Sequence, residues 1–342
     1  MKKITGCILL LCISSFTSLP PCDEGKLFEK APFPIGVAIN TDKLKSEENY
    51  WTRAIGQFNS FTPEKILKPQ FIHPQKNTYQ FSETDRLISF CRERNIRLHG
   101  HALVWHKAMP LWMEKFKGNE TEWEQLLKEH IQTVMGHCKN YIRSWDVVNE
   151  AFNDDGSLRK NIWLKNLGPS YIEKAFRFAR EADTTALLFY NDYSLEQNGV
   201  KLDAVLQFLA SLKSKGVPIH GIGMQMHVGL RHPWIAQING AAKKIQDSGY
   251  IIHFSELDVT LKGDHPLFIS GKKLLEMQKE RYATIVKGYM QIDKDKRFGI
   301  TLWGVSDNDS WLTDDHLRAR PLLFDDRYRP KPAYCGFVEG LR

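Results

Sequence analysis

The chain has 342 residues, of which 42% are apolar and 25% charged, a composition typical of globular proteins and unlike that of disordered or fibrous ones. Its formal net charge of +7 comes from basic residues interspersed with acidic ones, and no basic run reaches five residues. This pattern gives no support to a nucleic-acid or membrane-surface role, so we expect neither kind of partner.

The first residues have the composition of an export signal. Lys2 and Lys3 precede an apolar run at 8–16, and small residues and prolines follow as far as Cys22. Such a leader is too short to remain as a membrane-spanning helix, and no later stretch approaches that length. We expect residues 1–21 to be a signal peptide and the protein to be secreted or periplasmic. Acylation of Cys22, which would make a lipoprotein, is the less favoured alternative because prolines stand where small residues are wanted.

Residues 22–33 read as a short N-terminal segment and 34–342 as one domain. Eight apolar, β-rich segments follow in chain order at 35–41, 58–64, 97–105, 144–150, 186–193, 221–228, 251–259 and 299–305. Stretches with helical spacing lie between most of them. Strands that alternate with helices predict a single (β/α)8 TIM barrel of the α/β class.

Several of the predicted helices have recognisable ends. Three starts approximate or satisfy a capping box: Ser82 with Asp85, Thr121 with Glu124, and Ser170 with Glu173. Two helices are expected to stop at glycine C-caps, Gly216 and Gly249.

Polar and aromatic side chains stand at the ends of the predicted strands. Glu64, Glu150 and Glu256 end the second, fourth and seventh strands. The other strand-end residues are Trp105, Asn191, Asp192, Tyr193, Gln225, His227, Asp258 and Trp303. In a parallel barrel these ends meet on one catalytic face. Two carboxylates that face each other across a cleft are what acid/base hydrolysis of a glycosidic bond requires, so Glu150 and Glu256 are the candidate pair.

Strings that follow one another in family order resemble glycoside hydrolase family 10, the retaining endo-β-1,4-xylanases. They are Phe-Asn-Ser-Phe-Thr-Pro-Glu at 58–64, His-Ala-Leu-Val-Trp-His at 101–106, Trp-Asp-Val-Val-Asn-Glu at 145–150, Asn-Asp-Tyr at 191–193, Gly-Met-Gln-Met-His at 223–227, Glu-Leu-Asp-Val at 256–259, Leu-Trp-Gly-Val-Ser-Asp at 302–307, Ser-Trp at 310–311 and Pro-Leu-Leu-Phe-Asp at 321–325. The resemblance implies an enzyme that cuts internal bonds of xylan and needs no cofactor. Xylan and xylo-oligosaccharides would be its partners, and we expect a monomer.

The resemblance also implies roles for the carboxylates. Glu150 would protonate the leaving oxygen and later deprotonate the incoming water, and Glu256 would form a covalent glycosyl-enzyme intermediate. Retaining enzymes hold such carboxyls ~5–5.5 Å apart. Across so short a gap, charge on Glu256 is expected to raise the pKa of Glu150 and keep it protonated.

Support and sugar-binding roles are implied for the remaining residues. Asn149 would bind the sugar 2-hydroxyl, and His227 would hydrogen-bond Glu256 while Asp258 holds its ring. The other expected sugar contacts are Glu64, the donors Lys68, His101 and Gln225, the apolar wall of Trp303 and Trp311, the floor of Trp105, and Tyr193 as a stacking platform on the leaving-group side. Taken singly, each has a structural alternative, such as a solvated lysine, a core histidine or a core tryptophan.

The chain departs from the family pattern at three places. Lys65 follows Glu64 where asparagine is common, His99 precedes Gly100 where arginine is frequent, and Lys107-Ala108 replaces a polar pair. We expect Lys65 either to tune the distal subsite, with a preference for acidic decoration, or simply to point into solvent.

Two other classes of function remain open. His99, His101 and His106 suggest a metal-dependent hydrolase, although the expected metal content is none. A carbohydrate-binding barrel without catalysis is the second, and the presence of both carboxylates argues against it. Cys91, Cys138 and Cys335 match no metal motif, and the sequence does not choose disulfide partners among them.

Overall fold

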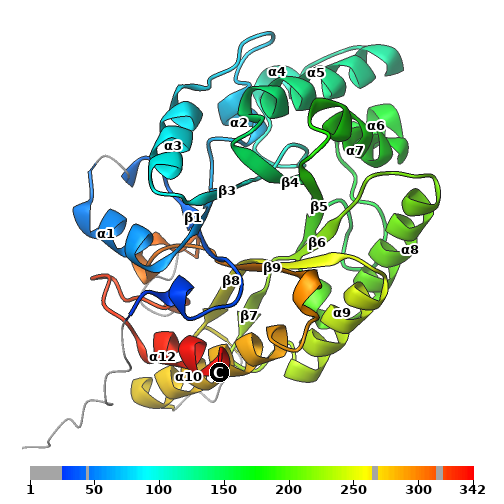
Figure 1. Ribbon diagram of the computed structural model, residues 1–342. Helices are drawn as coiled ribbons and strands as arrows, with labels where there is room; N and C mark the ends of the chain where they lie inside the picture. The colour runs from blue at the N-terminus through cyan, green and yellow to red at the C-terminus, as the bar shows by residue number, and fades with distance from the viewer. Residues whose placement is uncertain (1–24, 44–45, 264–268, 313–318) are drawn as a thin grey trace, which may run out of the picture.

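The computed structural model describes residues 25–43, 46–263, 269–312 and 319–342. Parallel strands form a sheet that the pairing of β6 with β8 closes into a barrel (Figure 1). The strands are β1 (Ile35–Ile39), β2 (Ser60–Pro63), β3 (Arg97–Gly100), β4 (Ile142–Asn149), β5 (Leu187–Asp192), β6 (Gly221–Met224), β7 (His227–Gly229), β8 (Ile251–Thr260) and β9 (Arg297–Leu302). β7 is a short addition that pairs with β8, and the other eight strands make the closed ring. The expected leader and Cys22 lie outside the described residues.

Each of the eight predicted segments overlaps an observed strand, which confirms the (β/α)8 barrel, although β3 ends at Gly100 and not at the predicted Trp105. The segment at 221–228 is interrupted because Met226 has a φ of 64°, in the left-handed region. Backbone bonds still tie this irregular stretch to β8, since the amides of Glu256 and Asp258 donate to the carbonyls of Gln225 and Met226. Side chains at the end of β6 and the start of β7 therefore keep fixed positions.

Helices surround the barrel and cover its outer face (Figure 1). They are α1 (Glu48–Gln57), α2 (Pro69–Ile72), α3 (Ser82–Glu93), α4 (Leu111–Glu114), α5 (Glu120–Cys138), α6 (Ile162–Leu167), α7 (Ser170–Ala182), α8 (Val200–Ser214), α9 (Ile235–Asp247), α10 (Gly271–Tyr289) and α12 (Pro332–Gly340). Short 3-10 turns occur at η1 (Leu27–Glu29), η3 (Leu195–Gln197), η4 (Lys294–Lys296) and η5 (Asp307–Asp309).

The predicted helix starts are wrong in their capping residues. Phe81 is the N-cap of α3, with no side-chain cap bond, and Ser82 is already helical. In α5 the capping box is made by Asn119 and Glu122, two residues before the predicted pair. The hydroxyl of Ser170 donates to a preceding carbonyl and does not cap α7. The pattern is degenerate, because any short polar side chain can cap if the backbone places it first.

Both predicted glycine ends are confirmed. Gly216 and Gly249 follow α8 and α9 with φ values of 72° and 83°. A side chain is strained in this left-handed region, so glycine lets the chain leave the helix toward the next strand.

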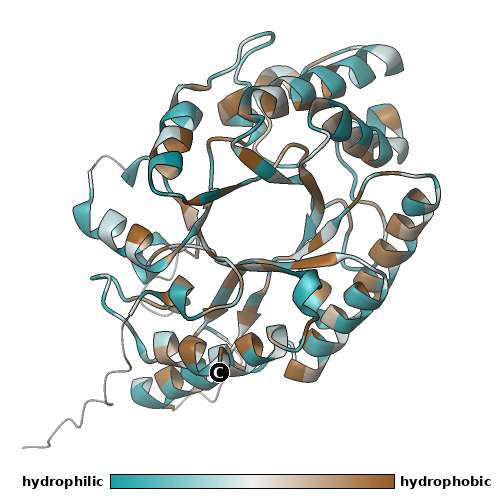
Figure 2. Cartoon of the chain, in the orientation of Figure 1, coloured by the Kyte–Doolittle hydropathy of each residue, from teal (hydrophilic) through white to brown (hydrophobic). Residues whose placement is uncertain are grey.

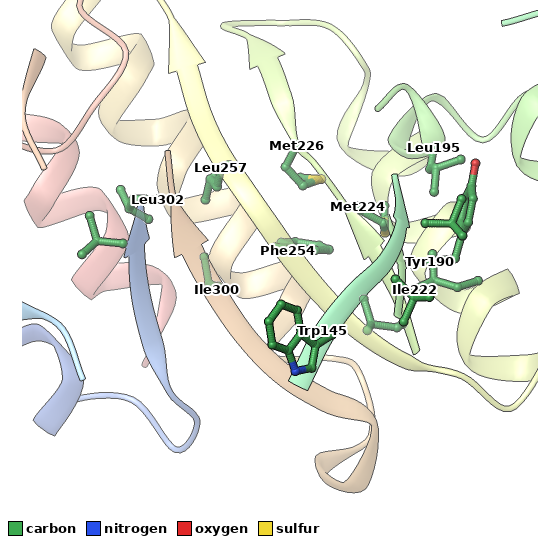
Figure 3. Packing of buried hydrophobic residues seen from close by; sticks show 14 of the residues in the cluster. Trp145, Tyr190, Leu195, Ile222, Met224, Met226, Phe254, Leu257, Ile300 and Leu302 are labelled. Atoms are coloured by element: carbon green, nitrogen blue, oxygen red, sulfur yellow. The ribbon is translucent and has the colours of Figure 1, made fainter. Parts of the chain in front are cut away.

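The hydrophobic core lies between the strands and the helices. Hydrophobic colour concentrates on the strands and on the helix faces that meet them, while the outer helix faces are hydrophilic (Figure 2). Trp145, Ile222, Phe254 and Ile300, from four different strands, belong to one buried cluster (Figure 3). Full burial of such a side chain stabilises the fold by about 1.5–3 kcal/mol. This layer fixes the strand register and thereby the positions of the strand ends.

The structure also bears on the expectations for disulfide pairing and for a membrane-spanning helix. Cys91 and Cys138 are buried free thiols, whereas Cys335 is disulfide-bonded. Burial raises the pKa of the Cys91 and Cys138 thiols to about 12, which makes them unreactive. Within the described residues, no helix combines the length and apolar character that crossing a membrane requires.

Candidate active site

A cleft of about 670 Å³ opens on the barrel. Both candidate carboxylates and every residue expected to bind sugar line it: Glu64, Lys68, His101, Trp105, Asn149, Glu150, Tyr193, Gln225, His227, Glu256, Trp303 and Trp311. These residues come from strand ends and adjoining loops far apart in the sequence, as the barrel interpretation predicts. Asp258 lies behind His227, where the sequence placed it.

Glu256, within β8, is held by donors on both carboxylate oxygens. The amide of Asn191 donates to Oε1 at 2.8 Å, and His227 Nε2 lies 3.3 Å from Oε2. His227 Nδ1 lies 2.9 Å from Asp258 Oδ2, so the ring is fixed between two carboxylates. The predicted contacts of His227 with Glu256 and Asp258 are therefore present.

The charge of His227 follows from these neighbours. Burial alone would lower its pKa, but the carboxylates of Asp258 and Glu256 outweigh burial and raise the pKa well above the ordinary value. His227 is thus an imidazolium at neutral pH, and both of its ring nitrogens donate. A positive charge beside Glu256 favours an oriented carboxylate there.

Glu150 follows the last residue of β4 and has a φ of 56°, in the left-handed region. Its amide donates to the Asn191 carbonyl at 2.9 Å, and its carbonyl accepts from Arg159 Nε at 3.0 Å. Gln225 Nε2 donates to its Oε1 at 3.2 Å. These contacts hold a strained turn that directs the carboxyl into the cleft.

The pKa expected for Glu150 is wrong in direction for the free protein. Burial raises the pKa, but hydrogen bonds from Gln225 and Trp105 to the carboxylate, with the nearby His106, lower it below the ordinary value. His106 Nδ1 lies 3.8 Å from Glu150 Oε2, and burial lowers the pKa of His106 to about 4. The sequence argument considered repulsion between the two carboxylates and missed the donors around one of them.

Asn191 is a site residue to which the sequence analysis gave no role. Its amide joins Glu256 to Asn149, whose Oδ1 lies 2.9 Å from Asn191 Nδ2. The side chain fits because Gly223 faces it: a Cβ on Gly223 would lie 2.1 Å from Asn191 Oδ1. Ser255 Oγ also donates to that oxygen at 2.6 Å. The strand-end position of Asn191 was the signal for this role.

Aromatic side chains form the walls of the cleft. Lys68 Nζ lies 4.7 Å from the centre of the Trp105 ring, and Trp303 meets His101 edge-on at 5.3 Å. Trp311 is 49% exposed and donates from Nε1 to Asp258 at 2.8 Å, so the solvent-facing indole is held in place. Exposed and half-buried tryptophans that line a cleft are suited to stacking against sugar rings.

The cleft continues past Tyr193, beyond the residues predicted from the sequence. Arg159 donates to the Tyr193 hydroxyl, and Lys201 Nζ lies 3.4 Å from the centre of its ring. Further lining residues without a predicted sugar-binding role are His106, Lys107, Ser194, Gln197, His232 and Gln237. The sequence analysis noted His106 as a possible metal ligand and Lys107 as a departure from the family pattern, whereas the other four residues belong to no recognisable motif.

The family model for glycosyl hydrolase family 10 matches residues 25–340, nearly the whole described chain. The chain belongs to this family. The match agrees with the resemblance seen in the sequence and with the placement of the motif residues around one cleft.

Relatives within family 10 cover the chain to different extents. Endo-1,4-beta-xylanase B of Thermotoga neapolitana is 35% identical over 99% of this chain and 97% of its own length. Exoglucanase XynX of Acetivibrio thermocellus is 37% identical over 90% of this chain, but the chain spans 28% of that protein. The structure of xylanase10C (mutant E385A) from Cellvibrio japonicus in complex with xylopentaose is 34% identical with a TM-score of 0.88, covering 93% of this chain and 69% of that one.

The three histidines that suggested a metal site, His99, His101 and His106, do not converge on one point. His99 and His101 both face Asp146, at 3.1 and 2.9 Å, while His106 lies toward Glu150. Across the described ranges, no three His, Cys, Asp or Glu side chains are grouped so as to hold a metal ion. The histidines of this family 10 chain already have carboxylate neighbours.

Proposed function

We propose that the protein is an endo-1,4-β-xylanase that hydrolyses xylan with retention at the anomeric carbon. The observation that carries the proposal is the pair of carboxylates, Glu150 and Glu256, which line one open cleft and are linked by hydrogen bonds through Asn191, Asn149 and Gln225. Membership of family 10 supports it. Lining aromatic side chains and an open cleft suit a polymer better than a small, fully enclosed ligand.

In the first step Glu256 attacks the anomeric carbon while Glu150 gives its proton to the leaving glycosidic oxygen. The carbon–oxygen bond breaks, a covalent ester to Glu256 forms, and the shortened chain leaves with the proton. Asn191 and His227 fix the attacking carboxylate, so little reorganisation is needed. Glu150, now ionised, is stabilised by Gln225 and Trp105.

In the second step Glu150 takes a proton from water as the water attacks the same carbon. The ester breaks, Glu256 is regenerated, and the sugar keeps its original configuration. The donors that lower the pKa of Glu150 favour this base step. For the acid step, a bound substrate must raise the pKa by excluding water from the carboxyl.

The substrate class rests on the relatives. Xylan is favoured because several relatives are named endo-xylanases and one neighbour was solved with xylopentaose. One relative carries the name exoglucanase, which makes a β-glucan the second candidate. Lys65 is exposed next to the cleft-lining Glu64, a position compatible with its proposed influence on the distal subsite.

Export and a monomeric state belong to the same proposal. Export is argued from the composition of residues 1–21, and the acylated form through Cys22 is its alternative. A polymer as large as xylan is available to an enzyme outside the cell. Size-exclusion chromatography and the N-terminal sequence of the mature protein would test these statements.

Product profiling tests the substrate and the endo mode. The mature chain is incubated with glucuronoxylan, arabinoxylan and a β-glucan in the presence of a chelator, and the oligosaccharides are followed over time. We expect early release of mixed xylo-oligosaccharides that the chelator does not reduce. Cleavage of the glucan alone would refute the assignment of xylan as the substrate. Inhibition by the chelator would support the metal-dependent hydrolase instead. Binding of the polysaccharide without products would indicate a carbohydrate-binding protein.

Two variants test the roles of the carboxylates. Glu256→Ala should abolish hydrolysis of xylan, and added azide should restore cleavage of an activated aryl glycoside with inverted product. Glu150→Ala should slow xylan far more than the aryl glycoside, because only a poor leaving group needs a proton donor. Normal xylan cleavage by the first variant, or equal losses on both substrates by the second, would remove that residue from its role.

A further inference from the structure

Beneath the cleft, β3 and β4 place a chain of polar side chains inside the barrel. His101 Nδ1 lies 2.9 Å from Asp146 Oδ2. On the other side of the carboxyl, His99 Nε2 lies 3.1 Å from Asp146 Oδ1, at ion-pair distance though without the alignment of a strict hydrogen bond. His99 Nδ1 lies 2.9 Å from Ser144 Oγ. The chain of contacts therefore starts at Ser144 and ends at His101, which lines the cleft.

The carboxyl in the middle of this chain is ionised. Asp146 is 1% exposed, and burial alone would raise its pKa. The two imidazoles outweigh burial and hold the pKa well below the usual range. A carboxylate only accepts hydrogen bonds, so His101 faces it with Nδ1–H and His99 with Nε2–H.

Other titratable groups in this interior layer have different partners. His253 Nε2 lies 2.8 Å from Thr301 Oγ1, and burial lowers the pKa of His253 well below its ordinary value, so that ring is neutral. It meets the His99 ring edge-on at 5.0 Å. Arg97 bonds to the Ser60 hydroxyl and to a backbone carbonyl of β9. His99 and His101 are thus the two titratable side chains in contact with Asp146.

We infer that His99 is a positioning residue for the cleft: through Asp146 it holds His101 in the tautomer whose proton is on Nδ1 and whose Nε2 faces the sugar. The nitrogen of an imidazole that carries the proton is set by the partner of the other nitrogen. Held in this tautomer, His101 accepts a hydrogen bond from a sugar hydroxyl at Nε2, whereas the sequence analysis expected a donor. The inference rests on the proposed function because its effect on catalysis is measured with xylan.

Replacement of His99 should weaken the control that Asp146 has over the tautomer of His101. Asp146 would keep one imidazole neighbour, and its carboxylate would lose the contact that fixes its orientation toward His101 Nδ1. The Nε2–H tautomer of His101 would then become accessible, so the face presented to the sugar would change in part from acceptor to donor. Sugar recognition, rather than the chemistry of the carboxylate pair, is the step affected.

Three variants separate this role from general destabilisation. His99→Leu removes the contact with Asp146, His99→Gln keeps an amide donor, and His253→Leu is the matched control, a buried histidine of the same layer. We expect His99→Leu to lower kcat/KM for xylohexaose about tenfold, mainly through KM, the equivalent of one hydrogen bond. His99→Gln should recover most of the loss, and His253→Leu should retain the wild-type KM.

The tautomer is measured directly from imidazole ¹⁵N chemical shifts, assigned through a His101→Gln variant. We expect the wild-type His101 to carry its proton on Nδ1 and the His99→Leu protein to show an altered Nδ1 signal. An Nε2–H tautomer in the wild-type protein, or equal losses of activity in His99→Leu and His253→Leu with unchanged His101 shifts, would overturn the inference. If His99→Leu does not fold, the ¹⁵N spectrum of the wild-type protein and the kcat/KM of His99→Gln still test the inference. If the wild-type protein does not hydrolyse xylan, the proposed function fails while the spectra test His99 independently.

Discussion

The hydrogen bond from Gln225 to Glu150 makes a specific prediction for the pH dependence of catalysis. Gln225 Nε2 donates to Glu150 Oε1 at 3.2 Å and stabilises the ionised form. Gln225→Met removes this donor and keeps the length and volume of the side chain. Without this donor the ionised form of Glu150 is less stabilised against the cost of burial, so the pKa of Glu150 rises. The protonated carboxyl then persists to higher pH.

The size of the shift follows from the strength of the bond. A hydrogen bond to a charged group contributes about 1.5–3 kcal/mol, and 1.36 kcal/mol corresponds to one pH unit. Because this bond is long and Trp105 remains as a donor, the lower end applies, and the expected shift is about one unit upward. The assay is kcat/KM for xylohexaose against pH, since this ratio reports the ionisation of the free enzyme.

Gln237→Met is the matched control for this experiment. Gln237 lines the same cleft and donates to the Gln197 carbonyl at 3.0 Å, with no hydrogen bond to Glu150. The alkaline limb of its kcat/KM–pH profile should stay at the wild-type position. If the alkaline limb of a folded Gln225→Met protein also stays at the wild-type position, Gln225 is not the main donor that lowers the pKa of Glu150.

Three further outcomes are expected. Gly223→Ala places a Cβ on the Asn191 amide, so kcat should fall at least tenfold and unfolding become easier by about 1–3 kcal/mol, as measured by kinetics and urea denaturation. Lys331→Met removes the partner of buried Asp307 at 2.8 Å and leaves Arg320 at 3.7 Å, so the loss should be near the lower end of the range for a broken buried pair, about 3 kcal/mol, much of which Asp307→Asn in the same chain should restore. Lys65→Asn should lower the activity ratio of glucuronoxylan to undecorated xylan, and an unchanged ratio would assign Lys65 to solvent.

Controls for the first two outcomes come from the same chain. Gly136 of α5 has no atom within 4 Å of an added Cβ, so Gly136→Ala should leave kcat unchanged and stabilise the helix by about 0.5–1 kcal/mol. An equal loss of kcat in both alanine variants would contradict the proposed contact with Asn191. If Asp307→Asn does not rescue Lys331→Met, the weakened compensation of the buried Asp307 charge is not the cause of the loss.

The sequence was sufficient for the barrel and for the strand-end residues at the centre of its cleft. Apolar, β-branched strands that end in polar residues carry both the fold and the site, because a parallel barrel brings strand ends together. Glycine ends such as Gly216 were predictable for a similar reason, since the left-handed conformation depends on one residue. In each case the information lies in a few consecutive residues, and the fold only brings those residues together.

Properties that depend on several neighbours were not predictable. Ser170 fits a capping pattern, yet its hydroxyl finds a carbonyl partner that only the folded backbone supplies. The pKa of Glu150 depends on donors from Gln225 and Trp105, one 75 positions away in the chain. Repulsion between carboxylates was a sound physical argument, but it left out the environment that decides the direction.

Register explains why Asn191 has a central place in the site. β4 and β5 pair Asn149 with Asn191, and β5 and β6 pair Asn191 with Gly223. The Asn191 amide therefore lies beside Asn149 on one side and faces Gly223, which has no Cβ, on the other. This leaves the amide free to reach Glu256. A shift of β5 by one residue would turn this amide to the opposite face of the sheet. The packing of the apolar layer, which fixes the register of β5, thus controls the orientation of Glu256 through the Asn191 amide.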